Sequence, residues 1–103
     1  MSSSFADAHA ALERSVLEGP GKASVQARQA AADGSADDSP LGRYLAKVRE
    51  AAYRVTPEEL EALRATHSDD ELFELTVAAS LGAATRQLEA GFAAVAAAFE
   101  EQP

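Results

Sequence analysis

Hydrophobic residues recur every three or four positions along most of this sequence, the spacing that places them on one face of an α-helix. Between these stretches stand glycine, proline and serine clusters of the kind that end one helix and start the next. The pattern therefore predicts an all-α protein, a small bundle of about five helices with a long helix at the C-terminus. The expected helices cover residues 5–16, 24–32, 39–52, 56–65 and 69–99.

Two of the expected helices begin with the same signature. Thr56 is followed three residues later by Glu59, and Ser68 is followed in the same way by Glu71. In such a capping box the hydroxyl accepts the N–H of the glutamate, and the glutamate side chain accepts the N–H of the capping residue. Capping accounts for the acidic residues at both helix starts, because no histidine or third carboxylate stands beside them at metal-ligand spacing.

The last expected helix is apolar on two sides. One side carries large residues, namely Phe73, Val77, Leu81, Leu88, Phe92, Val95 and Phe99. The other side is lined mostly by small residues, which allow a neighbouring helix to approach closely. We expect this second side to contact another helix, either across a subunit boundary or deep in the core. The candidate interface consists of Leu75, Ala79, Gly82, Ala83, Arg86 and Ala90.

Charged residues on several helices leave alternatives open. Arg86 lies within an apolar span, so it marks the edge of an interface or binds an anion, with Glu89 as the nearest carboxylate on the helix. His9 precedes Glu13 by one turn, so it is either a solvent-edge histidine, which the weakness of such pairs favours, or a pH-sensitive ion pair at the helix edge. A basic strip on the third helix is either a solvated face or a docking strip for an acidic partner surface or an anionic ligand. The strip consists of Arg43, Lys47, Arg49 and Arg54.

Composition narrows the classes of function. The chain carries nine Lys and Arg against seventeen Asp and Glu, a formal net charge of −8, so its field repels nucleic-acid phosphates and anionic lipid headgroups. No leader peptide pattern opens the sequence and no apolar run is long enough to span a membrane, so we expect a single-domain cytoplasmic protein. The absence of cysteine excludes a disulfide, a zinc thiolate site and a catalytic thiol within this chain.

Two longer stretches carry a family resemblance: VTPEELEAL at residues 55–63 and SDDELFELTVAA at residues 68–79, followed by Arg86-Gln87-Leu88. Residues 39–95 resemble the C-terminal helices of the carboxymuconolactone decarboxylase and alkylhydroperoxidase-D-like family. The resemblance implies an all-helical protein that assembles into a homo-oligomer, commonly a trimer or hexamer. It also divides the chain into N-terminal short helices and a linker, residues 1–38, and a family-like helical core, residues 39–103.

The redox members of that family carry a Cys-x-x-Cys pair with a nearby histidine, and this chain has no such pair. Neither His9 nor His67 matches the position of the family's histidine. No catalytic, cofactor-binding or metal-ligating residue is therefore assigned.

Three functions remain open. The resemblance without its reactive residues favours a non-catalytic oligomeric or accessory subunit, with a related family enzyme as one possible partner. The amphipathic N-terminal segments would also suit a protein-interaction regulator. A thiol-independent enzyme, similar to a decarboxylase or isomerase and acting on a small acid, would have only a few groups to use. These groups are His67, Arg86, Glu58, Glu59 and Glu61.

We expect no thiol-dependent peroxidase activity from the purified chain, because the attacking species in that reaction is a thiolate and the chain has none. The measurement is hydroperoxide consumption with a dithiol donor in the presence of a metal chelator. Turnover above the protein-free rate would contradict the prediction.

Overall fold

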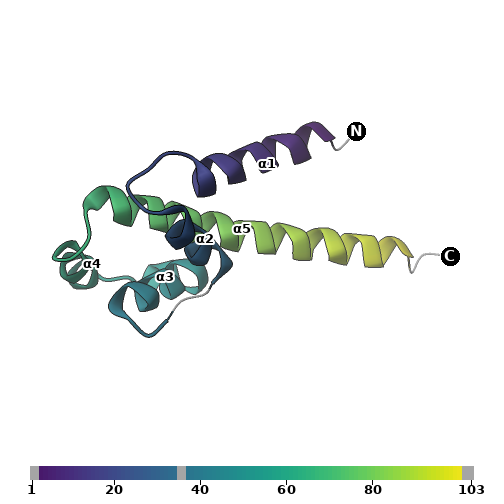
Figure 1. Cartoon of the computed structure of the whole chain (residues 1–103). Coiled ribbons are helices and arrows are strands. Elements are labelled where there is room, and N and C mark those ends of the chain that lie inside the picture. The colour runs from purple at the N-terminus through teal and green to yellow at the C-terminus, as the bar shows by residue number, and fades with distance from the viewer. Residues whose placement is uncertain (1–2, 35–36, 101–103) are drawn as a thin grey trace.

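The computed structural model describes residues 3–34 and 37–100, with side chains of the first helix described from Ala6 onward. Within these residues the fold is all-α and contains no strand, which confirms the predicted fold class. The elements are α1 (Ser3–Glu18), α2 (Val25–Asp33), α3 (Pro40–Glu50), the 3-10 helix η1 (Ala52–Arg54), α4 (Pro57–Arg64) and α5 (Asp69–Glu100). In Figure 1, α2, α3 and α4 gather around the first half of α5, α1 runs alongside its middle, and the C-terminal end of α5 extends past them all.

Hydroxyl side chains start four of these helices, as the sequence predicts. Each accepts the backbone N–H three residues later, and the capping residues are Ser24, Ser39, Thr56 and Ser68. Gly34 ends α2 with a φ of 82°, a left-handed conformation that glycine adopts without steric cost. The third helix ends at Glu50, short of the predicted boundary, and gives way to η1. Residues 35 and 36 of the expected linker and the side chain of Phe5 lie outside the described residues.

Only one of the two predicted capping boxes is complete. At Ser68 the backbone N–H donates to Glu71 Oε1 over 3.2 Å, closing the box. At Thr56 the structure shows the hydroxyl half alone, because the Glu59 carboxylate pairs instead with Lys47 Nζ at 3.1 Å. The prediction for Glu59 was wrong because α3 brings a cation beside it, and a charged donor competes well with a backbone N–H. This pair ties α4 to α3.

The core forms where α2 and α3 pack on the first half of α5. The helices approach closely, as the low aromatic content predicts, because half of the ten buried hydrophobic residues in the described part of the chain are alanine. These ten residues are Ala23, Ala31, Ala32, Tyr44, Leu45, Leu63, Leu72, Leu75, Ala78 and Ala79. The Tyr44 hydroxyl lies 2.6 Å from Thr76 Oγ1 and links α3 to α5.

The face of α5 that packs on α2 is the small-residue face, and Gly82 shows why. A Cβ atom at this position would lie 2.1 Å from the carbonyl oxygen of Ala32, so the end of α2 touches the backbone of α5 directly. The large-residue side is consequently turned away from the core. Phe73, Phe92, Val95 and Phe99 are 70%, 59%, 53% and 67% exposed, whereas Val77, Leu81 and Leu88 are half-buried.

Glu74 on α5 holds the loop that leads into α2. Its carboxylate accepts the N–H of Lys22 at 3.0 Å and the N–H of Ala23 at 2.8 Å. These two hydrogen bonds, that of Lys22 first, lower the pKa of the Glu74 carboxyl below its ordinary value of 4.5. The loop and the start of α2 are therefore attached to α5 by one ionised side chain.

The two mid-helix glycines of α5 should respond oppositely to alanine. Gly82→Ala should cost about 1–3 kcal/mol, because the new methyl group overlaps the Ala32 carbonyl and forces α2 away. Gly91→Ala should be neutral or stabilise the chain by up to about 1 kcal/mol, since nothing lies within 4 Å of its Cβ position. Urea unfolding at low protein concentration measures both, and equal effects would contradict the close approach of α2.

The Glu74 hydrogen bonds predict an acid-dependent loss of stability. Because the folded pKa is lowered, the stabilisation is complete above the ordinary value of 4.5 and is lost as the pH falls through the folded pKa. The melting temperature of Glu74→Gln should therefore fall less steeply on acidification than that of the wild type. Glu50→Gln, which changes an exposed carboxylate on α3, is the matched control and should follow the wild type.

Candidate functional site

The C-terminus of α2 accounts for most of the residues predicted to form an interface. Leu75 and Ala79 are buried in the core, Gly82 meets the backbone of α2, and Ala83 is half-buried. The close neighbouring helix expected for this face is thus α2 of the same chain. Ala90 differs, because it is exposed.

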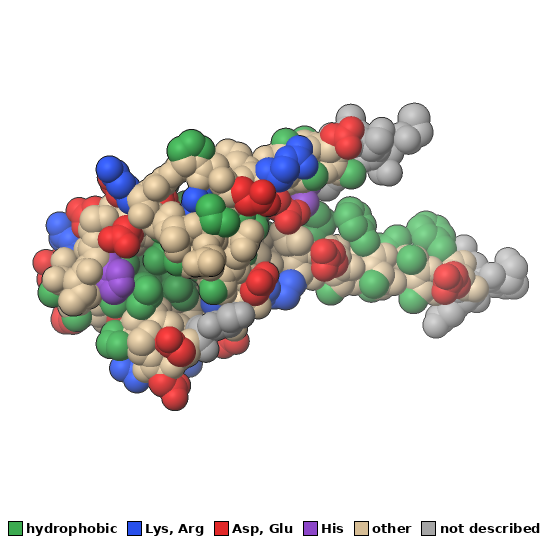
Figure 2. Space-filling view, in the orientation of Figure 1, with side chains coloured by type: hydrophobic (Ala, Val, Ile, Leu, Met, Phe, Trp, Pro, Cys, Tyr) green, Lys and Arg blue, Asp and Glu red, His purple; other side chains and the backbone are tan. Residues whose placement is uncertain are grey.

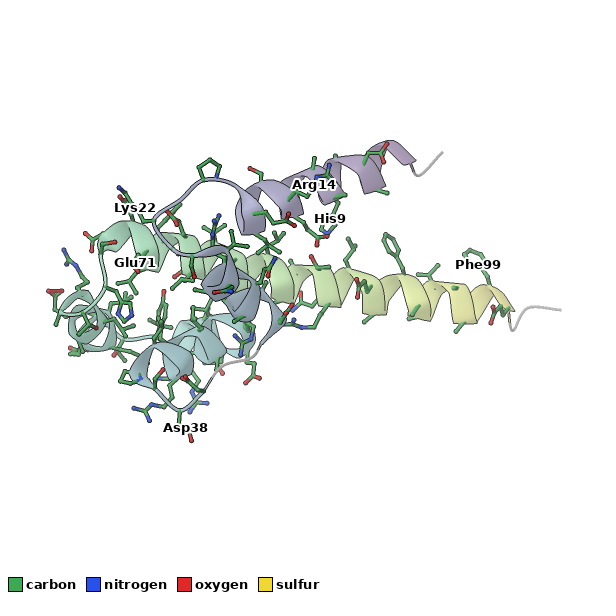
Figure 3. All side chains as sticks on the ribbon, viewed as in Figure 1. His9, Arg14, Lys22, Asp38, Glu71 and Phe99 are labelled. Atoms are coloured by element: carbon green, nitrogen blue, oxygen red, sulfur yellow. The ribbon has the colours of Figure 1, made fainter. Side chains whose placement is uncertain are left out.

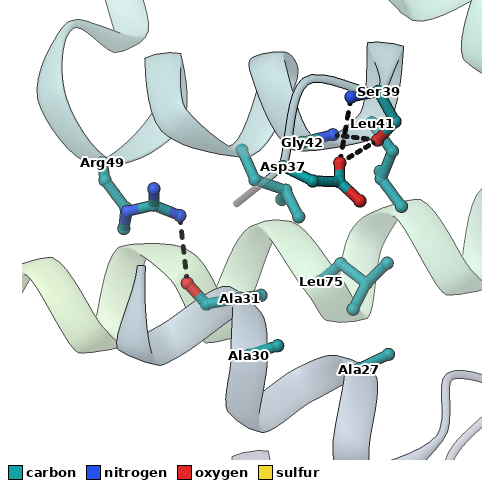
Figure 4. A pocket seen from close by; sticks show the side chains of 10 residues that line it. Ala27, Ala30, Ala31, Asp37, Ser39, Leu41, Gly42, Arg49 and Leu75 are labelled. Carbon is teal, nitrogen blue, oxygen red and sulfur yellow. Dashed lines mark hydrogen bonds between the residues drawn. The ribbon is translucent and has the colours of Figure 1, made fainter. Parts of the chain in front are cut away.

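Two arginines from different helices bind the end of α2. Arg86 on α5 donates from Nη1 to the Ala32 carbonyl at 2.9 Å, and Arg49 on α3 donates to the Ala31 carbonyl at 3.2 Å (Figure 4). Their positive charges also face the negative end of the α2 dipole. The partner of Arg86 is therefore a backbone carbonyl rather than Glu89, and Arg49 of the expected basic strip is used inside the fold.

Arg28 makes a similar contact at the end of α1. It is only 4% exposed, and its Nη1 donates to the Val16 carbonyl at 3.1 Å. Sequence reasoning missed this residue because nothing around it on the alanine- and glutamine-rich α2 indicates that it is buried. Three arginines thus hold helix ends in place.

A cavity of about 160 Å³ lies between α2 and α3. Figure 4 shows the side chains that line it. Its walls are mainly alanine and leucine side chains, with Arg49 and Asp37 at the edges. Arg49 is bound to α2, and Asp37 accepts the Ser39 N–H at 2.9 Å. Hydrogen bonds from Ser39, the side-chain bond first, lower the pKa of Asp37. The polar groups around this cavity serve the local structure.

The groups available to a thiol-independent enzyme are not brought together. His67 Nδ1 lies in the turn before α5, 3.3 Å from the Leu63 carbonyl. Arg86 lies seventeen residues after Asp69, the first residue of α5, so it is about 26 Å along the helix axis from the end of α5 where His67 lies. Glu61 pairs with Arg64 at 3.2 Å on α4. Among residues 3–34 and 37–100, no group of three His, Asp or Glu side chains is arranged to hold a metal ion.

The second half of α5 presents a continuous apolar surface. We define residues 90–99, reading AGFAAVAAAF, as the distal segment. All ten of these residues are exposed, and none has a charged or hydrogen-bonding side chain. Figure 2 shows hydrophobic side chains along this helix, past the end of the bundle. No helix in the described part of the chain meets the length and hydropathy needed to span a membrane.

A groove between α1 and α5 continues this surface toward the bundle. We define the α1–α5 groove by Ala6, His9, Ala10, Leu88 and Phe92, with Glu13 and Glu89 at its rim. The two helices run antiparallel, and the space between them opens toward the free end of α5 (Figures 1 and 2).

His9 stands at the inner end of this groove. Its Nε2 lies 3.2 Å from Thr85 Oγ1 and 2.9 Å from Glu13 Oε1, so the structure shows the His9–Glu13 pair and not the solvent-edge histidine that sequence reasoning favoured. In Figure 3, His9 points from α1 toward α5, and Phe99 lies on the side of α5 nearer α1. The groove and the distal segment therefore share one side of α5.

Comparisons with protein-family models, with curated proteins and with solved structures find no match to this chain. The distal segment and the groove are therefore the features of this chain that bear on its function. The sequence contained a signal for the distal segment, since no charged residue occurs between Glu89 and Glu100.

Proposed function

We propose that this chain is a non-catalytic helical subunit, oligomeric or accessory, that works by association through the distal segment of α5. The observation that carries the proposal is the exposure of ten consecutive uncharged residues on a regular helix. A helix that is apolar on all sides is stable where neighbouring helices bury it. Exposed apolar patches of this kind mark protein–protein contacts in folded proteins.

The surface area of the chain supports the same proposal. A compact monomer of 10.7 kDa exposes about 5,500 Å² by the usual scaling of area with mass, whereas this chain exposes 7028 Å². The excess is about 1,500 Å². The radius of gyration is 16.1 Å, against about 13 Å for a compact domain of this length. The chain therefore has spare surface available for association.

The polar side chains support a structural role. Arg28, Arg49 and Arg86 bind helix carbonyls, and Glu74 holds a loop. Each of these groups therefore stabilises the fold. The resemblance of residues 39–95 to the alkylhydroperoxidase-D-like family supports assembly as well, because members of that family form homo-oligomers. We propose in addition that this chain is a member of that family that lacks the redox cysteine pair.

A charge placed on the distal segment should weaken association. Phe92→Glu should raise the dissociation constant at least about tenfold, because the carboxylate would be desolvated in a contact that offers it no partner. The melting temperature at low protein concentration should change little, since Phe92 is 59% exposed in the monomer. Light scattering and sedimentation across a concentration series measure the association.

Ser80→Glu is the matched control, because it adds the same charge at an exposed position on the first half of α5 and should leave association unchanged. The proposed function would be contradicted by two results obtained together. One is a wild type that remains monomeric at millimolar concentration, and the other is a Phe92→Glu variant that keeps every binding partner that the wild type retains.

A further inference from the structure

We propose that the distal segment is covered by the distal segment of a second copy, antiparallel to it, so that the end of each α5 enters the α1–α5 groove of the other. This inference rests on the proposed function and names its partner. It follows from the spacing of the large residues, the position of the groove, the distribution of charge and the spare surface area.

The large residues of the second half of α5 have a spacing that reads the same in both directions. Leu88, Phe92, Val95 and Phe99 are separated by four, three and four positions. Two antiparallel copies related by a twofold axis between Phe92 and Val95 therefore place Leu88 of one opposite Phe99 of the other. The same register places Phe92 opposite Val95. A parallel pair would set each residue beside its own copy and leave both grooves unfilled.

The groove lies where the antiparallel register needs it. Leu88 and Phe92 form the α5 side of the groove, and Ala6 and Ala10 form part of the α1 side. Phe99 and Val95 of the second copy would lie against Leu88 and Phe92, and small residues on α1 leave space for these larger side chains. Each copy thus supplies a large-residue helix end and a groove lined partly by alanine. The result is a bundle of four helices, α1 and α5 from each copy.

The distribution of charge favours a second copy over a basic partner helix. The distal segment offers no carboxylate to a cation, although the whole chain carries a net charge of −8. In the antiparallel register Glu89 faces Ala98 of the second copy, and Glu100 faces Gln87, so carboxylates do not oppose one another. The remaining repulsion is between whole molecules and is screened by salt. Association should therefore tighten as ionic strength rises.

The spare surface is large enough for such a dimer. A stable interface buries about 800 Å² from each partner, and the excess area of this chain is about 1,500 Å². A twofold interface uses the same patch on both copies, so assembly closes at two subunits.

Disulfide trapping tests the register directly, because the chain contains no cysteine of its own. Leu88→Cys is mixed with a mass-tagged Phe99→Cys and oxidised with glutathione. Opposed cysteines form the mixed disulfide, whereas the two Leu88→Cys positions would lie about 16 Å apart along the helix axis and do not. We expect the mixed product to exceed either same-site product roughly tenfold. Ser80→Cys, exposed on the first half of α5, is the control and should form no disulfide with either variant.

The outcomes separate this inference from the proposed function. Same-site disulfides without the mixed product would show parallel pairing and overturn the inference, while association through the distal segment would stand. A monomer that forms no disulfide overturns the inference. The comparison of the binding partners retained by the wild type and by Phe92→Glu then decides whether the proposed function stands. Sedimentation from about 50 to 500 mM salt adds a second test. Self-association that weakens as salt rises would show that attraction between opposite charges holds the copies together, and would overturn the apolar register.

Discussion

The contact between the end of α2 and the backbone of α5 determines the arrangement of the other helices. It depends on Gly82, because any side chain there would meet the Ala32 carbonyl. The carbonyls left open at the end of α2 are then bound by Arg49 from α3 and Arg86 from α5, so that three helices meet at one point. Half of the buried core residues are alanine, and close approach of the helices compensates for their small side chains.

This contact also explains where the large apolar residues of α5 lie. With the small face committed to α2, the opposite side is left to α1 along part of its length and to solvent beyond it. The bundle is shorter than α5, so beyond Phe92, which lines the groove with α1, the distal segment extends past the other helices described for this chain (Figure 1). An isolated chain of this shape exposes apolar surface that a partner would bury. The functional proposal follows from this division of the two faces.

The acidic character of the chain fits an association that is selective. Strong net charge keeps such a molecule apart from others through long-range repulsion. An uncharged helix end then provides a short-range contact for a partner of matching shape. Of the polar residues that sequence reasoning offered for catalysis, Arg86 and His67 contact backbone carbonyls, and Glu59 and Glu61 pair with Lys47 and Arg64. The apolar surface is therefore the feature best suited to a function.

The sequence by itself determined the features that depend on neighbours within a turn or two. The caps at Ser24 and Ser68 and the left-handed end of α2 at Gly34 involve atoms a few residues apart, so their signatures suffice. Tertiary structure decided which face of α5 is buried and which partners Glu59 and Arg86 take. Those outcomes depend on how closely α2 and α3 approach, and that distance is set by a steric contact and competing hydrogen bonds between residues far apart in the sequence.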